Sequence, residues 1–166
     1  ETGQFENTFI IFLSDNGACA EWDPYGFDVS SSANNVLHKD DDLKKIGTPE
    51  SYVSYGSGWA NACDTPWRLY KHYGHEGGIA TPAIIHWPTG MKSKEQGGLT
   101  PRLSYLPDIM ATCLELSGAN YPSERNGNKI LPPEGVSLVP LMKGKNPKPE
   151  IIVMEHEGNR AIRDGK

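Results

Sequence analysis

Residues 7–17 read Asn-Thr-Phe-Ile-Ile-Phe-Leu-Ser-Asp-Asn-Gly, and the prediction of the fold starts from this stretch. Five consecutive apolar residues, 9–13, are followed at once by the small and polar residues 14–17. A short apolar run rich in β-branched and aromatic residues predicts a buried strand with no polar face. Such strands are typical of parallel sheets that helices cover on both faces. The stretch therefore predicts an α/β fold.

Asp15 and Asn16 follow the apolar run directly. Ligands of open α/β sheets bind just beyond the carboxyl ends of the strands. A carboxylate and an amide carbonyl supply hard oxygen atoms, which suit Ca²⁺ or Mg²⁺. Asn16-Gly17 is also a strong hairpin-turn signal, although the segment 18–26 does not alternate and contains a proline. The residues alone leave both interpretations open, a metal or ligand site and a plain turn.

Composition sets the limits of the prediction. The chain has 166 residues, enough for one domain with a real core, and its formal net charge of −5 gives no basic footprint for nucleic acid. No apolar run approaches the roughly 20 residues that span a bilayer. The sequence starts with neither a signal peptide nor an initiator Met, and its last residues read like the entry to a further strand. We therefore expect a chain cut at both ends, whose export cannot be judged from its start.

The cysteines Cys19, Cys63 and Cys113 are odd in number and widely spaced. This pattern argues against a zinc site or a dense disulfide framework. Each of them is expected to be a small buried hydrophobic residue.

Residues 65–82 form the second informative stretch, Thr-Pro-Trp-Arg-Leu-Tyr-Lys-His-Tyr-Gly-His-Glu-Gly-Gly-Ile-Ala-Thr-Pro. This glycine-punctuated, cationic segment precedes a short apolar run at 83–87, which predicts another strand. Lys71 is well placed to act as a point charge on a sulfate or phosphate oxygen. The alternative is that Lys71 and Arg68 are surface charges and that the glycines only make turns.

Elsewhere the pattern indicates supporting structure. Residues 99–117 predict a helix that packs on the sheet and stops at Gly118, because apolar residues recur at helical spacing, at Leu103, Leu106, Met110, Cys113 and Leu114. Residues 151–154 predict a further buried strand. The long segment 18–65 predicts an irregular connection. Its charged run 39–45 is interpreted as a solvated loop rather than as a separate calcium loop.

Taken in order, four segments of the chain resemble the C-terminal part of a type I sulfatase, in particular the bacterial arylsulfatases. These segments are 7–17, 67–83, 107–118 and 157–165. The resemblance implies a fragment of an alkaline-phosphatase-like α/β/α sandwich with a mixed, mostly parallel sheet. It also implies that 1–150 belong to the catalytic domain and that 151–166 begin the crossing into a smaller C-terminal subdomain.

The resemblance further implies hydrolysis of sulfate monoesters. Asp15 and Asn16 match the second pair of ligands for Ca²⁺, with Mg²⁺ as an alternative ion. Lys71 matches the catalytic lysine that binds the sulfate and stabilises its charge. His75 matches a variable position that either lines the substrate pocket or lies at the surface. We expect His72 to be structural and His156 with Glu157 to face solvent.

The formylglycine nucleophile of this family is expected upstream, because none of the three cysteines is followed by the x-Pro/Ala-x-Arg context that its formation needs. The segment alone is therefore expected to be inactive and to depend on the rest of the sulfatase chain. The expected substrate is an aryl or carbohydrate sulfate ester, on which six aromatic residues offer stacking surfaces: Tyr52, Tyr55, Trp59, Trp67, Tyr70 and Tyr73.

Two alternatives to a sulfatase stay open from the sequence. The first is a phosphodiester or phosphonate monoester hydrolase of the same superfamily, and the second is a degenerate, non-catalytic binding module. Neither nucleic acid nor a membrane span is expected. By resemblance, the protein is expected in the periplasm or outside the cell.

Overall fold

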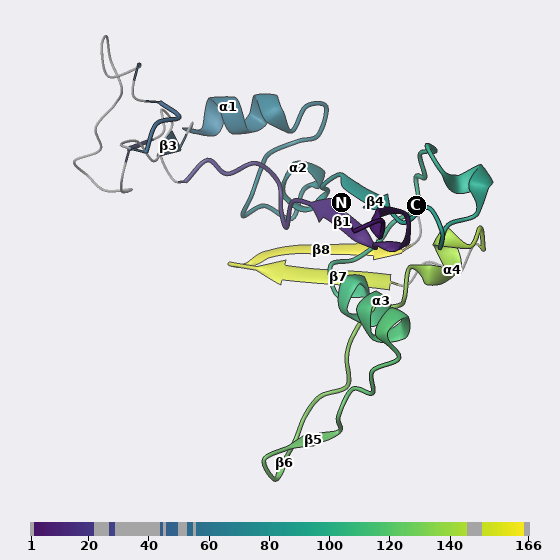
Figure 1. The fold of residues 1–166 in the computed structure, drawn as a ribbon. Helices are drawn as coiled ribbons and strands as arrows, with labels where there is room; N and C mark the ends of the chain where they lie inside the picture. Colours follow the sequence, from purple (N-terminus) through teal and green to yellow (C-terminus); the bar gives the residue numbers. More distant parts are fainter. Residues whose placement is uncertain are drawn as a thin grey trace. The chain divides into compact units, whose positions relative to one another are not determined.

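The computed structural model describes residues 2–21, 27–28, 44, 46–49, 53–54, 56–145 and 151–164. Its helices are η1 (Phe5–Asn7), α1 (Gly56–Cys63), α2 (Glu76–Ile79), η3 (Ser93–Glu95), α3 (Asp108–Ser117) and α4 (Val139–Met142) (Figure 1). Its strands are β1 (Ile10–Leu13), β2 (Phe27–Asp28), β3 (Val53–Ser54), β4 (Ala83–His86), β5 (Glu124–Arg125), β6 (Asn128–Lys129), β7 (Ile151–His156) and β8 (Asn159–Asp164). The charged run 39–45 lies almost entirely outside the described residues, as do Tyr52 and Tyr55.

The chain divides into two compact units. Unit 1 comprises residues 1–12, 84–152 and 162–166, and unit 2 comprises residues 13–83 and 153–161. The candidate site lies in unit 2.

In unit 1, the apolar run predicted as a strand does form one, β1, which pairs with β4. The expectation that this strand is buried without an exposed face is wrong. Alternate residues are exposed, with Ile10 at 40% and Phe12 at 72%, while Ile11 and Leu13 are half-buried. The physical reason is that β1 belongs to a two-stranded sheet, and within the described part of the chain nothing covers its second face.

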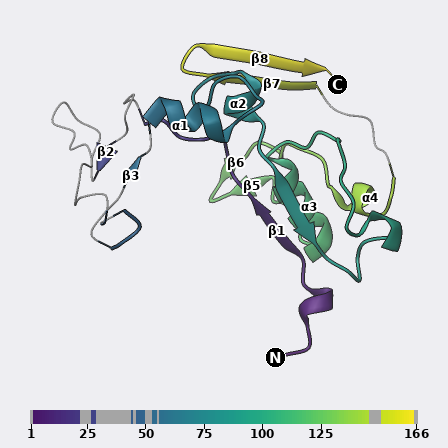
Figure 2. The same cartoon turned by 90° about the horizontal axis from the view of Figure 1, so that it is seen from above.

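The described strands are arranged in four two-stranded sheets, β1–β4, β2–β3, β5–β6 and β7–β8. The pairs β2–β3 and β5–β6 are antiparallel, with Phe27 opposite Ser54 and Glu124 opposite Lys129. These small sheets do not confirm the predicted mostly parallel sheet. Figure 2 shows β7 and β8 as one hairpin, whose two-residue turn, Glu157-Gly158, has positive φ at both positions. This is the conformation that two-residue hairpin turns favour.

The core of unit 1 is a cluster of Leu138, Val139 and Met142 at α4. Partly buried residues from distant segments pack against it, among them Phe9, Trp87 and Leu116. Phe9 and Trp87 meet edge to face, with their ring centroids 6.1 Å apart. The predicted helix and the first apolar run thus share one core.

Helix α3 ends where the sequence predicts, at Gly118, whose φ of 66° is left-handed and therefore suits glycine. It begins later than predicted, at Asp108, and Pro107 is the residue at its N-cap. The Asp108 carboxylate, 5% exposed, accepts hydrogen bonds from the backbone N–H of Tyr105 (2.8 Å) and of Val136 (2.8 Å). This side chain fixes the start of α3 against the segment before α4.

The buried face of α3 also differs from the predicted apolar stripe. Met110 is 54% exposed and Cys113 is exposed, whereas Thr112 is 1% exposed. The Thr112 hydroxyl donates to the carbonyl of Asp108 (2.6 Å) and accepts from the N–H of Leu138 (2.9 Å). A polar side chain with satisfied hydrogen bonds can be buried at little cost.

Candidate functional site

The loop that follows β1 carries Asp15 and Asn16 and belongs to unit 2. The Ser14 hydroxyl donates to the carbonyl of Asn16 (2.9 Å), and the Thr81 hydroxyl donates to the carbonyl of Ser14 (2.8 Å). Asp15 is exposed and Asn16 is half-buried. Among the described residues, none forms a hydrogen bond or ion pair with the carboxylate of Asp15 or the side-chain amide of Asn16. Both side-chain oxygens are therefore available to a ligand.

Backbone hydrogen bonds join this loop to the segment that carries Lys71. The Gly17 N–H donates to the carbonyl of Gly78 (3.0 Å), and the Lys71 N–H donates to the carbonyl of Ala18 (3.0 Å). The Ala18 N–H in turn donates to both carboxylate oxygens of Asp64, at 3.2 and 3.1 Å. The two stretches singled out in the sequence thus lie side by side in unit 2.

Glycine makes this close approach possible. A Cβ atom added at Gly17 would collide with the backbone carbonyl of Gly77, and one added at Gly77 would collide with the backbone carbonyls of Leu69 and Arg68. Both Gly17 and Gly77 are buried. The absence of a side chain at these positions therefore lets the two loops pack backbone to backbone.

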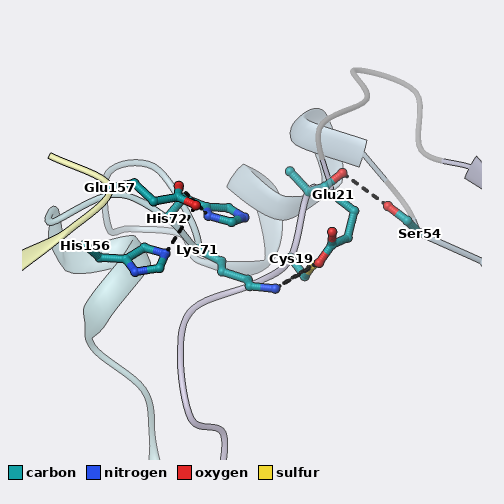
Figure 3. A network of polar contacts seen from close by, with 8 residues as sticks. Cys19, Glu21, Ser54, Lys71, His72, His156 and Glu157 are labelled. Atoms are coloured by element: carbon teal, nitrogen blue, oxygen red, sulfur yellow. Dashed lines mark hydrogen bonds and ion pairs between the residues drawn. The ribbon is translucent and has the colours of Figure 1, made fainter. Parts of the chain in front are cut away.

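The side chain of Lys71 extends toward residues 19–21, as Figure 3 shows. Its Nζ lies 2.8 Å from Glu21 Oε1 and 3.7 Å from Cys19 Sγ, and the Cys19 thiol donates to the same Glu21 oxygen (2.5 Å). The Lys71 side chain is 32% exposed and that of Glu21 is 31% exposed. The ammonium group is thus held by a carboxylate while it stays accessible.

The three groups shift one another's pKa values. The hydrogen bond from Lys71 to Glu21 raises the pKa of the lysine. Hydrogen bonds from Cys19 and then from Lys71 lower the pKa of Glu21. Burial, followed by the hydrogen bond to Glu21, raises the pKa of the Cys19 thiol. At neutral pH the arrangement therefore holds a charged ammonium, a charged carboxylate and a neutral thiol.

The expectation that every cysteine is a small buried residue is wrong for Cys63 and Cys113, which are exposed, while Cys19 is half-buried. All three are free thiols. Sequence reasoning did not find the carboxylate that holds Lys71. Glu21 lies 50 residues before that lysine, in a segment without a recognisable pattern, and only the folded chain brings the two together.

The donor set of the first loop suits a hard cation. Asp15 supplies a carboxylate and Asn16 an amide carbonyl, and Ca²⁺ takes 6–8 such oxygens. The residues present therefore fit Ca²⁺ as two of its ligands. Mg²⁺ accepts the same atoms but requires a stricter octahedral geometry.

His75 lies on the same segment as Lys71 but at its exposed edge. It precedes the first residue of α2, and its backbone carbonyl accepts hydrogen bonds from the N–H groups of Gly78 (2.8 Å) and Ile79 (3.2 Å). Its ring meets that of Tyr73 at a centroid distance of 6.4 Å. Its role toward substrate stays a prediction. Of the other aromatic residues of this region, Trp59 and Trp67 are exposed, and Tyr70 meets Tyr73 edge to face.

A second polar group in unit 2 was not predicted from the sequence. His72 Nδ1 lies 3.1 Å from Glu157 Oε2, and His156 Nε2 lies 3.8 Å from Glu157 Oε1 (Figure 3). These contacts agree with a structural His72, whose side chain is 16% exposed, while the exposed Glu157 faces imidazole groups as well as solvent. The 85 residues between His72 and Glu157 explain why no local pattern predicts their contact.

Within the described residues, no helix has both the length and the apolar character needed to cross a membrane.

Comparison with known proteins identifies relatives of one kind. An uncharacterized sulfatase of Schizosaccharomyces pombe is 34% identical in an alignment of 170 residues, and this alignment covers 98% of this chain and 29% of that protein. The arylsulfatase of Klebsiella aerogenes is 30% identical over 146 residues, which cover 87% of this chain and 30% of that protein. The human N-acetylgalactosamine-6-sulfatase is 28% identical, over 76% of this chain and 18% of that protein. No family model matches the chain.

The chain is therefore a homologue of the sulfatases over nearly its whole length, as the four segments predicted. It spans less than a third of the length of the relatives named above. Sulfatases are hydrolases of sulfate esters, so the relatives are hydrolases.

Proposed function

We propose that the chain is part of a sulfuric ester hydrolase of the arylsulfatase kind, in which it supplies two Ca²⁺ ligands, Asp15 and Asn16, and a sulfate-binding lysine, Lys71. One observation carries this proposal. The backbone hydrogen bonds of Gly17 and Lys71 bring two hard oxygen donors, the exposed Asp15 and the half-buried Asn16, onto a loop that adjoins the one carrying a charged ammonium group. The homology to sulfatases supplies the substrate class.

Lys71 binds and stabilises the anion. An ammonium group has three N–H donors. In unit 2, one is directed at Glu21 and one at Cys19, which leaves a third for an oxygen of a sulfate ester. Glu21 keeps the ammonium group charged. This ammonium group can therefore bind the substrate and also stabilise the negative charge that develops on the transferring group. Because the charge is already in position, the protein does not have to reorganise around it during the reaction.

Asp15 and Asn16 would hold Ca²⁺, which neutralises charge on the sulfate oxygens and fixes their position. These two ligands cannot complete a shell of 6–8 oxygens. The other ligands and the formylglycine nucleophile come from other parts of the full-length protein. His75, on the loop of Lys71, contacts the part of the substrate that carries the sulfate.

The finer architecture completes the proposal. Residues 1–150 belong to an alkaline-phosphatase-like catalytic domain with a mostly parallel sheet, and 151–166 begin the crossing into a smaller subdomain. The substrate is an aryl or carbohydrate sulfate, and the enzyme acts in the periplasm or outside the cell. The resemblance of the four segments and the sulfatase relatives support this proposal.

The test uses the full-length protein that contains this chain. Hydrolysis of an aryl sulfate and of an aryl phosphate is measured with Ca²⁺ and with a chelator, in the wild type, in Lys71→Ala and in the control Lys129→Ala. Lys129 is an exposed lysine on β6. We expect sulfate to be preferred, turnover to need the metal, and Lys71→Ala to lower kcat/KM by about 10²- to 10³-fold. Lys129→Ala should match the wild type.

Other results would separate the alternatives. A preference for phosphate would indicate a phosphoryl-transferring member of the superfamily. No turnover of either ester by the mature protein would indicate a non-catalytic binding module. Equal turnover in Lys71→Ala and the wild type would contradict the role of this lysine.

A further inference from the structure

Three metal-ligating side chains gather in unit 2, apart from the hydrogen-bonded group that holds Lys71. His72 comes from the loop between α1 and α2, and His156 and Glu157 come from the end of β7 and its turn. One ligand atom of each residue lies within 4.8 Å of the other two. The Glu157 carboxylate faces both imidazoles, at 3.1 Å from His72 Nδ1 and 3.8 Å from His156 Nε2. Two histidines and one carboxylate therefore converge on one point.

This donor set matches a borderline transition metal rather than calcium. Imidazole nitrogen suits Zn²⁺ and its neighbours in the first row, and a site of three protein ligands with an open fourth position is typical of accessible zinc. Bonds of about 2.0–2.1 Å to a tetrahedral ion place neighbouring ligand atoms about 3.3–3.4 Å apart. The two observed separations, 3.1 and 3.8 Å, lie on either side of that value but end on different oxygens of Glu157, Oε2 and Oε1. A bound ion would therefore require a rotation of the carboxylate, so that one of its oxygens faces both nitrogens.

The backbone holds His72 in an unusual conformation. Its φ of 83° is in the left-handed region that favours glycine, whereas the positive φ of Glu157 belongs to the hairpin turn. A strained backbone such as that of His72 is frequent at ligand-binding sites, where the surrounding structure keeps the strain in place. The rings of His72 and His156 stack, with centroids 5.7 Å apart and planes inclined by 25°. The arrangement thus presents the ligand atoms before any ion is bound.

The site is open to ions from solution. The His156 side chain is 64% exposed and that of Glu157 is 48% exposed, whereas His72 is 16% exposed and forms the inner side. An ion can enter from the exposed side and keep a water molecule as its fourth ligand.

We propose that His72, His156 and Glu157 form a binding site for a divalent transition metal ion, best matched by Zn²⁺, separate from the Ca²⁺ ligands Asp15 and Asn16. The ion would tie the turn of the β7–β8 hairpin to the residue directly after Lys71. His156 and Glu157 of the hairpin would then be fixed to the loop that carries Lys71. The proposal does not depend on sulfate hydrolysis, because its observations concern only these three side chains.

The test measures zinc binding to the full-length protein saturated with Ca²⁺, by calorimetric titration with Zn²⁺ against a competing chelator. The variants are His156→Ala and Glu157→Gln, which change exposed side chains. The matched control is His75→Ala, another exposed histidine of unit 2, which lies outside the group of three. We expect one zinc equivalent in the wild type and in the control, with affinity at least about 100-fold weaker in both variants.

A second readout reports geometry. Co²⁺ bound in place of Zn²⁺ should give the visible absorption of a four-coordinate ion in the wild type and lose it in His156→Ala. Unchanged zinc affinity in both variants would overturn the proposal, and so would a wild type that binds no more zinc than His156→Ala. Neither readout uses sulfatase activity, so a failure of the proposed function would leave this result interpretable.

Discussion

At the scale of single residues, the contact between Lys71 and Glu21 sets the charge state of the lysine that we propose binds the sulfate. Glu21 has a lowered pKa, so its stabilising contribution is present above the ordinary value of 4.5 and is lost as the pH falls through the lowered value. Lys71 has a raised pKa, so its contribution is present below 10.5 and is lost as the pH rises through the raised value. The ion pair is therefore intact across the whole range between these ordinary values.

The first prediction concerns Glu21→Gln. Removing the carboxylate charge should return the pKa of Lys71 toward its ordinary value, because the charged hydrogen bond is the main cause of the upward shift. The measurement is an NMR titration of the lysine side-chain Cε–Hε signals at alkaline pH. The matched control is Glu115→Gln on α3, which changes an exposed carboxylate that is not a partner of Lys71. An unchanged titration of Lys71 would contradict the ion pair.

At the scale of elements, the packing of the two loops depends on glycine. We predict that Gly77→Ala lowers the free energy of unfolding by about 1–3 kcal/mol or more, because the new Cβ would collide with backbone carbonyls that cannot rotate away. The control is Gly58→Ala in α1, where no other described residue comes within 4 Å of the added Cβ. Alanine at this helical position should raise stability by about 0.5–1 kcal/mol. Urea unfolding of both variants measures the difference, and similar values would contradict the close approach.

The start of α3 allows another prediction. Asp108→Ala should lower the free energy of unfolding by about 2–3 kcal/mol, because it leaves the N–H groups of Tyr105 and Val136 without their acceptor. Glu115→Ala on the same helix removes an exposed carboxylate and should change stability by less than about 0.5 kcal/mol. Thermal unfolding of both variants makes the comparison, and an equal midpoint would contradict the capping role of Asp108.

The helices and strands also show how much of the fold could be predicted from the sequence. The strand at β1, the strand at β4 and the stop of α3 at Gly118 were predictable, because each follows from a local pattern of apolar residues or from a glycine. The buried face of α3 was not. Thr112 is buried because its hydroxyl binds Leu138, 26 residues further on, and hydrophobic spacing carries no information about such a partner.

The candidate site was predictable to a similar extent. Asp15, Asn16 and Lys71 stand out as residue types next to strands and glycines, and the fold brings their loops together. Glu21, His156 and Glu157 could not be assigned roles in advance, since their partners come from segments about 50 and 85 residues away. Their contacts depend on tertiary structure alone.

At the scale of the whole molecule, the two proposed ligands, Asp15 and Asn16, are too few for tight calcium binding by this chain alone. We predict that the isolated 166-residue chain binds Ca²⁺ far more weakly than the full-length protein and hydrolyses no sulfate ester, because two donors leave most of a 6–8 oxygen shell unfilled. Calorimetry of both proteins makes the comparison. Micromolar binding to the isolated chain would contradict the prediction.

Large apolar side chains on the strands of unit 1 lead to a related expectation at this scale. Phe12 on β1 and Ile84 on β4 are 72% and 63% exposed. Exposed apolar strands promote association between chains. The calcium comparison should therefore be made at low protein concentration.

Cys19 gives the group around Lys71 a chemical reporter. Only the thiolate reacts with an alkylating reagent. The raised pKa of Cys19 and its half-buried position should make it react more slowly than the exposed Cys63 and Cys113. Because its thiol is hydrogen-bonded to Glu21, the carboxylate that holds Lys71, an anion that draws the lysine away should change the rate of labelling at Cys19 alone. Mass spectrometry of labelled peptides would then follow occupation of the site over time, without any need for turnover.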